Sequence, residues 1–114
     1  MALKVVRSLP SRGDVYLVQI DPTRGSEIRK TRPCLIVSPD ELNHHLRAVI
    51  VAPMTTAGQP SPFRFSCRFA GKQGRIVLDQ LRTVDRDRLT KRLGTIMSGT
   101  LASTLAILGE MFEL

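Results

Sequence analysis

The segment Phe63-Arg64-Phe65-Ser66-Cys67-Arg68-Phe69 has the most regular alternation of side-chain types in this chain. Phenylalanine or cysteine stands at every odd-numbered position, and arginine or serine stands at every even-numbered one. Neighbouring side chains of a β-strand point to opposite faces, so this pattern predicts a strand with one face in a hydrophobic core and the other in solvent. The segment therefore predicts a β-sheet that covers a core.

Five other segments have the composition of strands and are bounded by turn-forming residues. They are 14–20, 33–38, 48–55, 75–79 and 93–97. The run 33–38 is almost continuously apolar, which predicts a strand buried on both faces. Residues 70–74 are expected to form a turn and residues 39–43 a single helical turn. Asp85 is expected to cap a brief helical turn that ends at Leu89.

The end of the chain changes its period from that of a strand to that of a helix. Apolar residues recur there at spacings of four, three and four, at Leu101, Leu105, Leu108 and Phe112. This is the stripe of an amphipathic helix, with Ser98 or Thr100 as the expected N-cap. Many short strands followed by one helix predict a mainly β fold, a small barrel closed by a helix. We expect a single domain over residues 1–114, with residues 1–11 as a flexible basic arm.

Charge points to an anionic partner. The chain has 114 residues, with 17 Lys and Arg against ten Asp and Glu, which gives a formal charge of +7. Nucleic acid is the first candidate and an acidic protein the second, although solubility alone would also account for the charge. No apolar run approaches the ~20 residues of a membrane span, and the N-terminus lacks the pattern of a signal peptide. A cytoplasmic location is therefore expected.

Residue types that bind metals are few and scattered. Cys34 and Cys67 lie far apart among apolar neighbours, so both are expected in the core. His44 and His45 are adjacent and therefore point in different directions on any regular element. We predict no metal and no cofactor. With no Trp and one Tyr, the chain also lacks the aromatic residues of a base-stacking platform.

The loop 24–33 concentrates charges that suit phosphate chemistry. Its charged residues are Arg24, Glu27, Arg29, Lys30 and Arg32. Metal-free cleavage of RNA needs a base for the 2′-hydroxyl, a cation for the phosphate and a proton for the leaving oxygen. A carboxylate among arginines supplies the first two, and a guanidinium matches phosphate with two parallel hydrogen bonds. The same composition also fits an ordinary solvated loop.

Polar residues stand where two of the predicted strands end. Thr55-Thr56 ends one strand, and Asp79-Gln80 ends another, followed by Arg82. In a barrel such ends can meet at one rim, although each residue is also a common turn former. Residues 82–92 carry five basic side chains against two acidic ones. They either track a phosphate backbone or form a solvated face with internal ion pairs.

Several short motifs, in their order and spacing, resemble the MazF/PemK (Kid) family of toxins. They are RGDVYLV at 12–18, Asp21-Pro22, Gly25-Ser26-Glu27, Thr31-Arg32-Pro33, Ser38-Pro39, VAPMTT at 51–56, LDQLRTVD at 78–85 and Arg92-Leu93-Gly94. The resemblance implies an SH3-like barrel with a C-terminal helix, formed into a homodimer. It also implies a sequence-specific endoribonuclease that needs no metal, cleaves single-stranded RNA and leaves a 2′,3′-cyclic phosphate. A cognate acidic antitoxin of the MazE/PemI kind is expected to block the RNA groove.

The resemblance also implies roles, position by position. Arg32 matches an arginine proposed to act as acid or phosphate stabiliser. Glu27 matches an acid proposed as the base in MazF-like members, and Asp79 matches the aspartate assigned as the base in the PemK/Kid branch. Thr55 matches the catalytic threonine that ends the third strand, and Thr56 matches a neighbouring substrate contact.

Two departures from the family pattern bear on these roles. The Kid branch has its catalytic arginine where Val77 stands, and many members have His where Ser26 stands. The Kid-type acid–base pair is therefore incomplete, which favours Glu27 and Arg32 as the centre and leaves the base open between Glu27 and Asp79. The expected RNA-binding residues are Arg24, Ser26, Arg29, Thr56, Gln80 and Arg82. Two alternatives share the fold: a gyrase-poisoning toxin of the CcdB type, and an RNA-binding protein that does not cleave.

Overall fold

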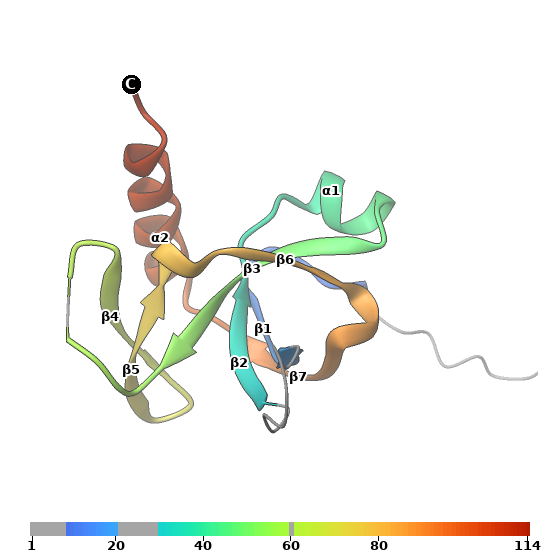
Figure 1. Ribbon diagram of the computed structural model, residues 1–114, viewed down its shortest axis with the longest axis horizontal. Coiled ribbons are helices and arrows are strands. Elements are labelled where there is room, and N and C mark those ends of the chain that lie inside the picture. Colours follow the sequence, from blue (N-terminus) through green and yellow to red (C-terminus); the bar gives the residue numbers. More distant parts are fainter. Residues whose placement is uncertain (1–8, 21–29, 60) are drawn as a thin grey trace, which may run out of the picture.

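The computed structural model describes residues 9–20, 30–59 and 61–114. Across these residues the chain forms seven strands, two α-helices and two short 3-10 helices (Figure 1). In chain order they are β1 Asp14–Ile20, β2 Lys30–Ile36, α1 Asp40–His45, β3 Ala48–Thr55, β4 Arg64–Phe69, β5 Lys72–Val77, η1 Leu78–Gln80, β6 Arg82–Asp85, η2 Arg86–Arg88, β7 Leu89–Thr95 and α2 Ser98–Met111. No helix of this part of the chain is long and apolar enough to cross a bilayer.

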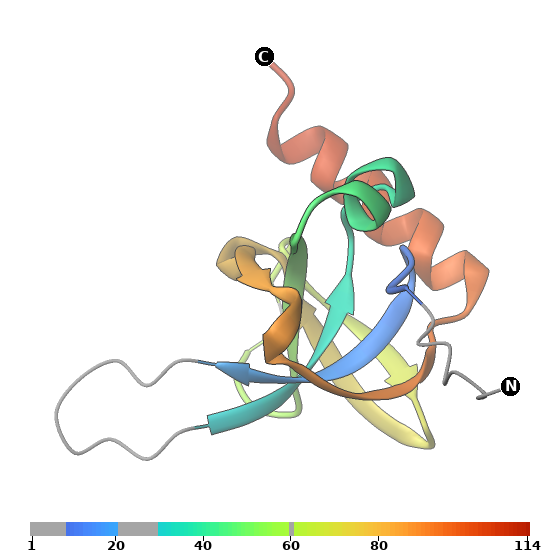
Figure 2. The same cartoon turned by 90° about the vertical axis from the view of Figure 1, so that its right-hand side faces the viewer.

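The strands form one antiparallel sheet that curls on itself in the order β4-β5-β3-β2-β1-β7, with β6 paired to β3 (Figures 1 and 2). Strand β3 is the centre of this arrangement. Its first four residues pair with β6, its middle pairs with β2, and its last two, Met54 and Thr55, pair with Ile76 and Arg75 of β5. The end of β3 is therefore the point where the two halves of the sheet meet.

The edge strands β4 and β7 approach each other through side chains instead of a hydrogen-bonded ladder. A Cβ atom built on Gly94 of β7 would lie 3.3 Å from the ring of Phe69 at the end of β4. The mainly β fold with a C-terminal helix is confirmed, but the sheet does not close into the predicted barrel: it curls on itself and stays open between β4 and β7.

Two clusters of buried side chains fill the fold. Strands β1 and β2 contribute alternate residues to each, so that Val15 and Leu35 lie in one cluster while Val18 and Ile36 lie in the other. The prediction that 33–38 is buried on both faces is confirmed. Cys34 and Cys67 are both buried, as expected, and burial raises the pKa of the Cys34 thiol to about 12.

Helix α2 presents a different stripe from the predicted one. Leu101 and Leu108 pack against the core, but Thr104 and Met111 complete this face in place of Leu105 and Phe112. Thr104 can be buried because its hydroxyl donates to the Thr100 carbonyl at 2.8 Å. The N-cap is Met97, with no capping side chain, so the expected cap at Ser98 or Thr100 was wrong. Phe112 follows the helix and is exposed.

Other boundaries differ from the sequence prediction for local reasons. The turn before β5 contains only Ala70 and Gly71, both with positive φ, as two-residue hairpins favour, so β5 starts at Lys72. Phe63 precedes β4 and is 41% exposed, contrary to its predicted core position. The strand predicted over 93–97 starts at Leu89, and β6 was missed altogether.

Two short helical turns follow the prediction. Helix α1 forms just after Pro39, and the Asp85 carboxylate accepts a hydrogen bond from the Asp87 backbone N–H at 2.9 Å, which caps η2. The strands predicted over 14–20 and 48–55 are confirmed with the same bounds. Most of the predicted basic arm, residues 1–8, lies outside the described residues.

Candidate functional site

Arg32 and Thr55 form a ridge between two cavities. The register that pairs Cys34 with Pro53 and Leu35 with Ala52 brings Arg32, two residues back on β2, level with Thr55 at the end of β3. Both residues line a first cavity of about 600 Å³ and a second of about 640 Å³. A group bound at this ridge can therefore extend to either side of it.

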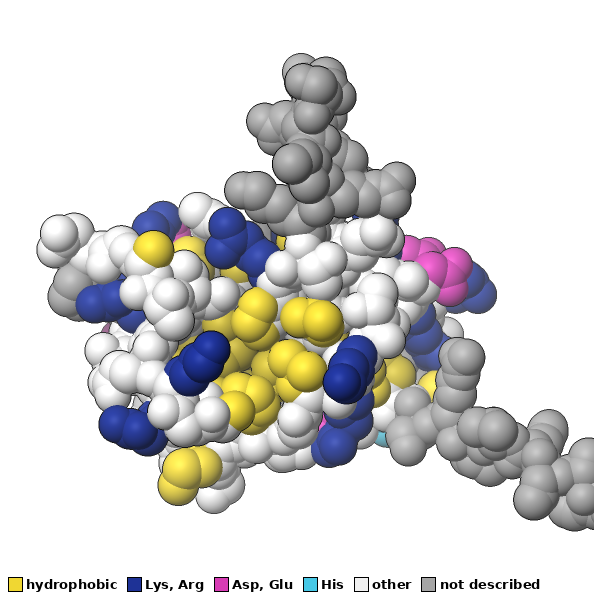
Figure 3. Space-filling view, turned by 90° about the horizontal axis from the view of Figure 1, so that it is seen from below, with side chains coloured by type: hydrophobic (Ala, Val, Ile, Leu, Met, Phe, Trp, Pro, Cys, Tyr) yellow, Lys and Arg dark blue, Asp and Glu magenta, His cyan; other side chains and the backbone are white. Residues whose placement is uncertain are grey.

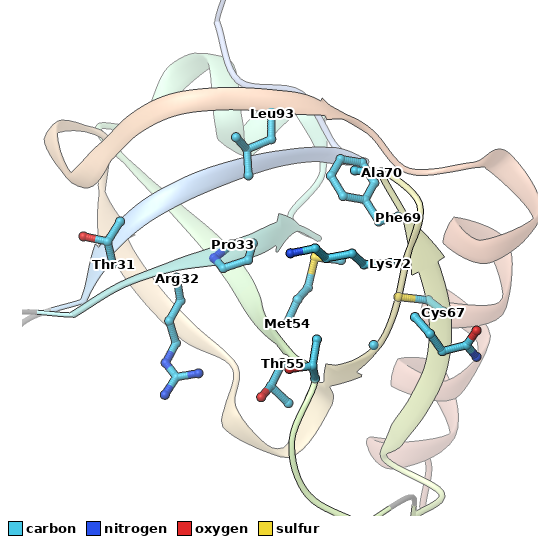
Figure 4. A pocket seen from close by; sticks show the side chains of 13 residues that line it. Thr31, Arg32, Pro33, Met54, Thr55, Cys67, Phe69, Ala70, Lys72 and Leu93 are labelled. Atoms are coloured by element: carbon cyan, nitrogen blue, oxygen red, sulfur yellow. The ribbon is translucent and has the colours of Figure 1, made fainter.

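The first cavity has an apolar floor and a polar rim. Its apolar lining residues are Pro33, Met54, Cys67, Phe69, Ala70 and Leu93. Figure 4 shows them with Thr31, Arg32, Thr55 and Lys72 around the same space. On the face seen from below, hydrophobic side chains gather at the centre, with Lys and Arg around them (Figure 3). Such a cavity can receive a flat, largely apolar group and fix it with a few polar contacts.

The second cavity is strongly cationic. Arg32, Arg64 and Arg82 line it from three different strands, together with Gln80 and Thr83. No acidic residue of the described chain is among its lining residues. Arginine recognises phosphate through paired N–H donors, so this cavity suits a phosphate-bearing ligand.

Thr55 is held in place by its local backbone. Its Oγ1 accepts a hydrogen bond from the Ala57 N–H at 3.1 Å, and its pairing with Arg75 ties it to β5. A hydroxyl that accepts one hydrogen bond can still donate its own proton. Thr55 therefore offers a donor at the ridge beside the Arg32 guanidinium.

Asp79 forms a bidentate ion pair with Arg64. Arg64 Nε donates to Asp79 Oδ1 at 2.8 Å, and Nη2 donates to Oδ2 at 2.7 Å. This guanidinium holds the pKa of the Asp79 carboxyl below its ordinary value. Arg64 is the cross-strand partner of Val77, the position at which the expected acid–base pair was incomplete.

The structure brings together five of the residues predicted from sequence: Arg32, Thr55, Thr56, Gln80 and Arg82. Asp79 joins them through Arg64. The remaining predicted residues, Arg24, Ser26, Glu27 and Arg29, lie outside the described residues. Within the described chain, no group of three or more His, Cys, Asp or Glu side chains is arranged to hold a metal ion.

Sequence reasoning missed Arg64, Lys72 and Gln73. The alternation of 63–69 placed Arg64 on the polar face of a strand but gave no indication of its partner, which lies 15 residues away. Lys72 and Gln73 were assigned to a turn that is shorter than predicted. A prediction that residues 64–69 and 72–77 pair as a β-hairpin would have identified all three residues.

Residues 11–112 match the family described as PemK-like, MazF-like toxin of type II toxin–antitoxin system. This chain belongs to that family. Endoribonuclease PemK of Escherichia coli is 38% identical over 107 residues, which cover 85% of this chain and 80% of that protein. Endoribonuclease toxin MazF of Escherichia coli strain K12 is 31% identical over 93 residues, covering 81% of this chain and 84% of that protein.

Solved structures of MazF proteins share the fold of this PemK/MazF-type toxin. A MazE–MazF crystal structure from Deinococcus radiodurans (Form-II) superimposes with a TM-score of 0.80 at 25% identity, covering 92% of this chain and 96% of that one. An endoribonuclease in complex with its cognate antitoxin from a mycobacterial species gives 0.75 at 25% identity, covering 89% and 92%. The fold and the family found from sequence are both confirmed.

Proposed function

We propose that this toxin is a sequence-specific endoribonuclease that cleaves single-stranded RNA without a metal ion. The observation that carries the proposal is the Arg32–Thr55 ridge, with an apolar cavity on one side and a cavity lined by arginines on the other. Single-stranded RNA has the matching parts, because its bases are flat and its backbone is anionic. Two relatives that align with most of this chain are named endoribonucleases, which supports the same activity here.

The proposed reaction is an attack of the ribose 2′-oxygen on the adjacent phosphorus. The 2′-oxygen gives its proton to a base and forms the new P–O bond, while the P–O5′ bond breaks and the 5′-oxygen takes up a proton. The products are a 2′,3′-cyclic phosphate and a 5′-hydroxyl. Arg32 binds the phosphate with its fork of donors, and the Thr55 hydroxyl donates to the same charge as it develops.

We propose Glu27 as the base. The alternative, Asp79, has both carboxylate oxygens bound to Arg64, which makes it a weaker proton acceptor. Thr56, Gln80 and Arg82 contact the substrate along the two cavities. Arg24, Ser26 and Arg29 are proposed to contact it from residues 21–29.

A cognate antitoxin and a second copy of this chain are the proposed protein partners. Solved relatives are described with MazE or with a cognate antitoxin. The charge of +7 favours an acidic antitoxin segment, and a cytoplasmic encounter with mRNA fits the proposed activity.

The deciding experiment is incubation of the purified protein with a long single-stranded RNA in excess EDTA. Cleavage with a 5′-hydroxyl on each downstream fragment is expected. Strict dependence on added divalent metal would contradict the mechanism. Retention of intact RNA would support the non-cleaving alternative, and inhibition of gyrase without RNA cleavage would support a CcdB-type toxin.

A further inference from the structure

The Arg64–Asp79 pair lies on a rigid frame next to the second cavity. The Leu78 backbone N–H donates to the Phe63 carbonyl at 2.8 Å, so the residues just before Asp79 and just before Arg64 are tied together. Leu78 itself is fully buried. The two charged side chains are only partly exposed, 33% for Arg64 and 39% for Asp79. Frame and ion pair together fix the direction of the Arg64 guanidinium.

The guanidinium keeps donors for a ligand after Asp79 is bound. A guanidinium has five N–H donors, and the two bonds to Asp79 come from Nε and Nη2. The third nitrogen, Nη1, lies toward Gly58, since a Cβ atom built there would be 4.0 Å from it. Gly58 and Arg64 both line the second cavity, so this edge of the guanidinium faces the space beside Arg32.

We propose that Arg64 binds the RNA phosphate adjacent to the scissile one, and that Asp79 is a positioning residue that holds the Arg64 guanidinium in place. The assignment rests on the proposed endoribonuclease function. It also defines the path of the RNA backbone through the second cavity. The scissile phosphate lies at the Arg32–Thr55 ridge, and the neighbouring phosphate lies between Arg64 and Arg82.

The geometry disfavours the opposite assignment, in which Asp79 takes the proton from the 2′-hydroxyl. Both of its oxygens accept short hydrogen bonds from one guanidinium. The same bonds lower the pKa of the carboxyl, whereas an effective general base has a pKa closer to the working pH. Asp79 also does not line either cavity beside the ridge.

The test compares Arg64→Ala, Asp79→Asn and the double variant with Arg68→Ala as a matched control. Arg68 lies on the same face of β4, is exposed and lines neither cavity. The binding probe is a mixed-sequence 2′-O-methyl oligonucleotide, which cannot be cleaved. Arg64→Ala should reduce the slope of log Kd against log salt by about 0.7, the loss of one single-strand phosphate contact. Arg68→Ala should leave the slope unchanged.

Cleavage of RNA supplies the second readout. Arg64→Ala should lower kcat/KM by about 10- to 100-fold, the scale of one charge-assisted hydrogen bond. The double variant should bind and cleave better than Arg64→Ala alone, because the single variant leaves the Asp79 carboxylate unpaired next to the second cavity, where its negative charge repels the phosphate. Circular dichroism of each variant checks that the fold is intact.

Two outcomes would overturn the assignment. If Arg64→Ala keeps the wild-type salt slope and rate, Arg64 binds no phosphate. If Asp79→Asn alone lowers kcat by ~10²- to 10⁴-fold, the effect of losing a general base, Asp79 acts on the proton directly. The wild-type protein could also cleave no RNA while Arg64→Ala still reduces the slope of log Kd against log salt. That result would contradict the proposed function and still support the phosphate site.

Discussion

Gly74 of β5 lies directly against the backbone of Thr55. A Cβ atom at position 74 would be 2.9 Å from the Thr55 carbonyl oxygen, closer than real Cβ atoms come. The next residue, Arg75, pairs with Thr55 in the sheet. The missing side chain at position 74 therefore lets β5 approach the end of β3 closely. This contact sets the position of the Thr55 backbone at the Arg32–Thr55 ridge.

Gly74→Ala is expected to lower the rate of RNA cleavage strongly while the protein stays folded. The added methyl group must push the Thr55 backbone away, and a displacement of about 1 Å at a catalytic group can cost on the order of 100-fold in rate. Overpacking of this kind costs about 1–3 kcal/mol of unfolding free energy. Single-turnover cleavage and urea unfolding measure the two effects separately.

Gly109→Ala is the matched control for this substitution. A Cβ atom on Gly109 of α2 meets nothing within 4 Å, so the change should raise the free energy of unfolding by about 0.5–1 kcal/mol. Its cleavage rate should equal that of the wild type. Equal activity in Gly74→Ala and Gly109→Ala would show that the contact at Thr55 has no part in catalysis.

Arg32→Ala should lower the cleavage rate by about 10²- to 10³-fold, the scale of losing one preorganised electrostatic donor. Folding should survive, because the side chain lines two open cavities instead of the core. Arg32→Lys should restore little of the rate, since a point charge cannot replace a two-pronged fork. Rates at saturating RNA are the measurement, and a fully active alanine variant would move the catalytic centre elsewhere.

The sequence predicted most accurately those strands whose own hydrophobic pattern is enough to identify them. The strands over 14–20 and 48–55 have apolar patterns that need no partner to be recognised, and they were found with their bounds. Strand β6 was missed because only Val84 of its four residues is buried, so its pattern is that of a solvated segment. The polar Thr104 concealed the buried face of α2, since its local hydrogen bond cannot be read from a hydropathy pattern.

The candidate site was predictable in part for a related reason. Arg32, Thr55, Gln80 and Arg82 were found because they stand in a basic loop or follow the ends of predicted strands, and because the motifs that contain them resemble a known family. Arg64 was not found, because its importance depends on a cross-strand register and a partner 15 residues away. A role that depends on a partner from another element of the fold cannot be read from the residue's own segment of sequence.

Asp40 should make the fold sensitive to acid. Its Oδ1 accepts the Arg12 backbone N–H at 2.7 Å, and this bond lowers the pKa of the carboxyl. A carboxyl with a lowered pKa stabilises the folded state above its unfolded pKa, and this contribution is lost as pH falls through the folded value. Asp40→Asn should therefore be less stable than the wild type at about pH 7, with a smaller difference at about pH 3. Urea unfolding at both pH values measures this; a difference that does not change with pH would contradict the role of the charge.

A symmetric homodimer is expected in solution, with the RNA grooves at or beside the subunit interface. One subunit is small, and its first cavity exposes an apolar floor framed by cations. Sedimentation velocity at micromolar concentration is the measurement. A monomer at that concentration would contradict the dimer, while leaving the assignments of Arg32 and Thr55 unaffected.

An acidic antitoxin segment is expected to fold onto the surface proposed to bind RNA, around Arg24, Arg29, Arg32 and Arg82. A disordered acidic chain can cover a long cationic groove as it folds, and the two polyanions would then compete for the same arginines. The test loads Arg32→Ala protein with a saturating uncleavable oligonucleotide and then titrates the antitoxin peptide by fluorescence anisotropy. Antitoxin affinity should fall in proportion to RNA occupancy.

Because the alanine itself can weaken the binding of both ligands, wild-type protein with the same oligonucleotide is the control. A ternary complex with both affinities unchanged would show that the antitoxin acts from a separate surface, and inhibition would then have to be transmitted through the fold to the ridge.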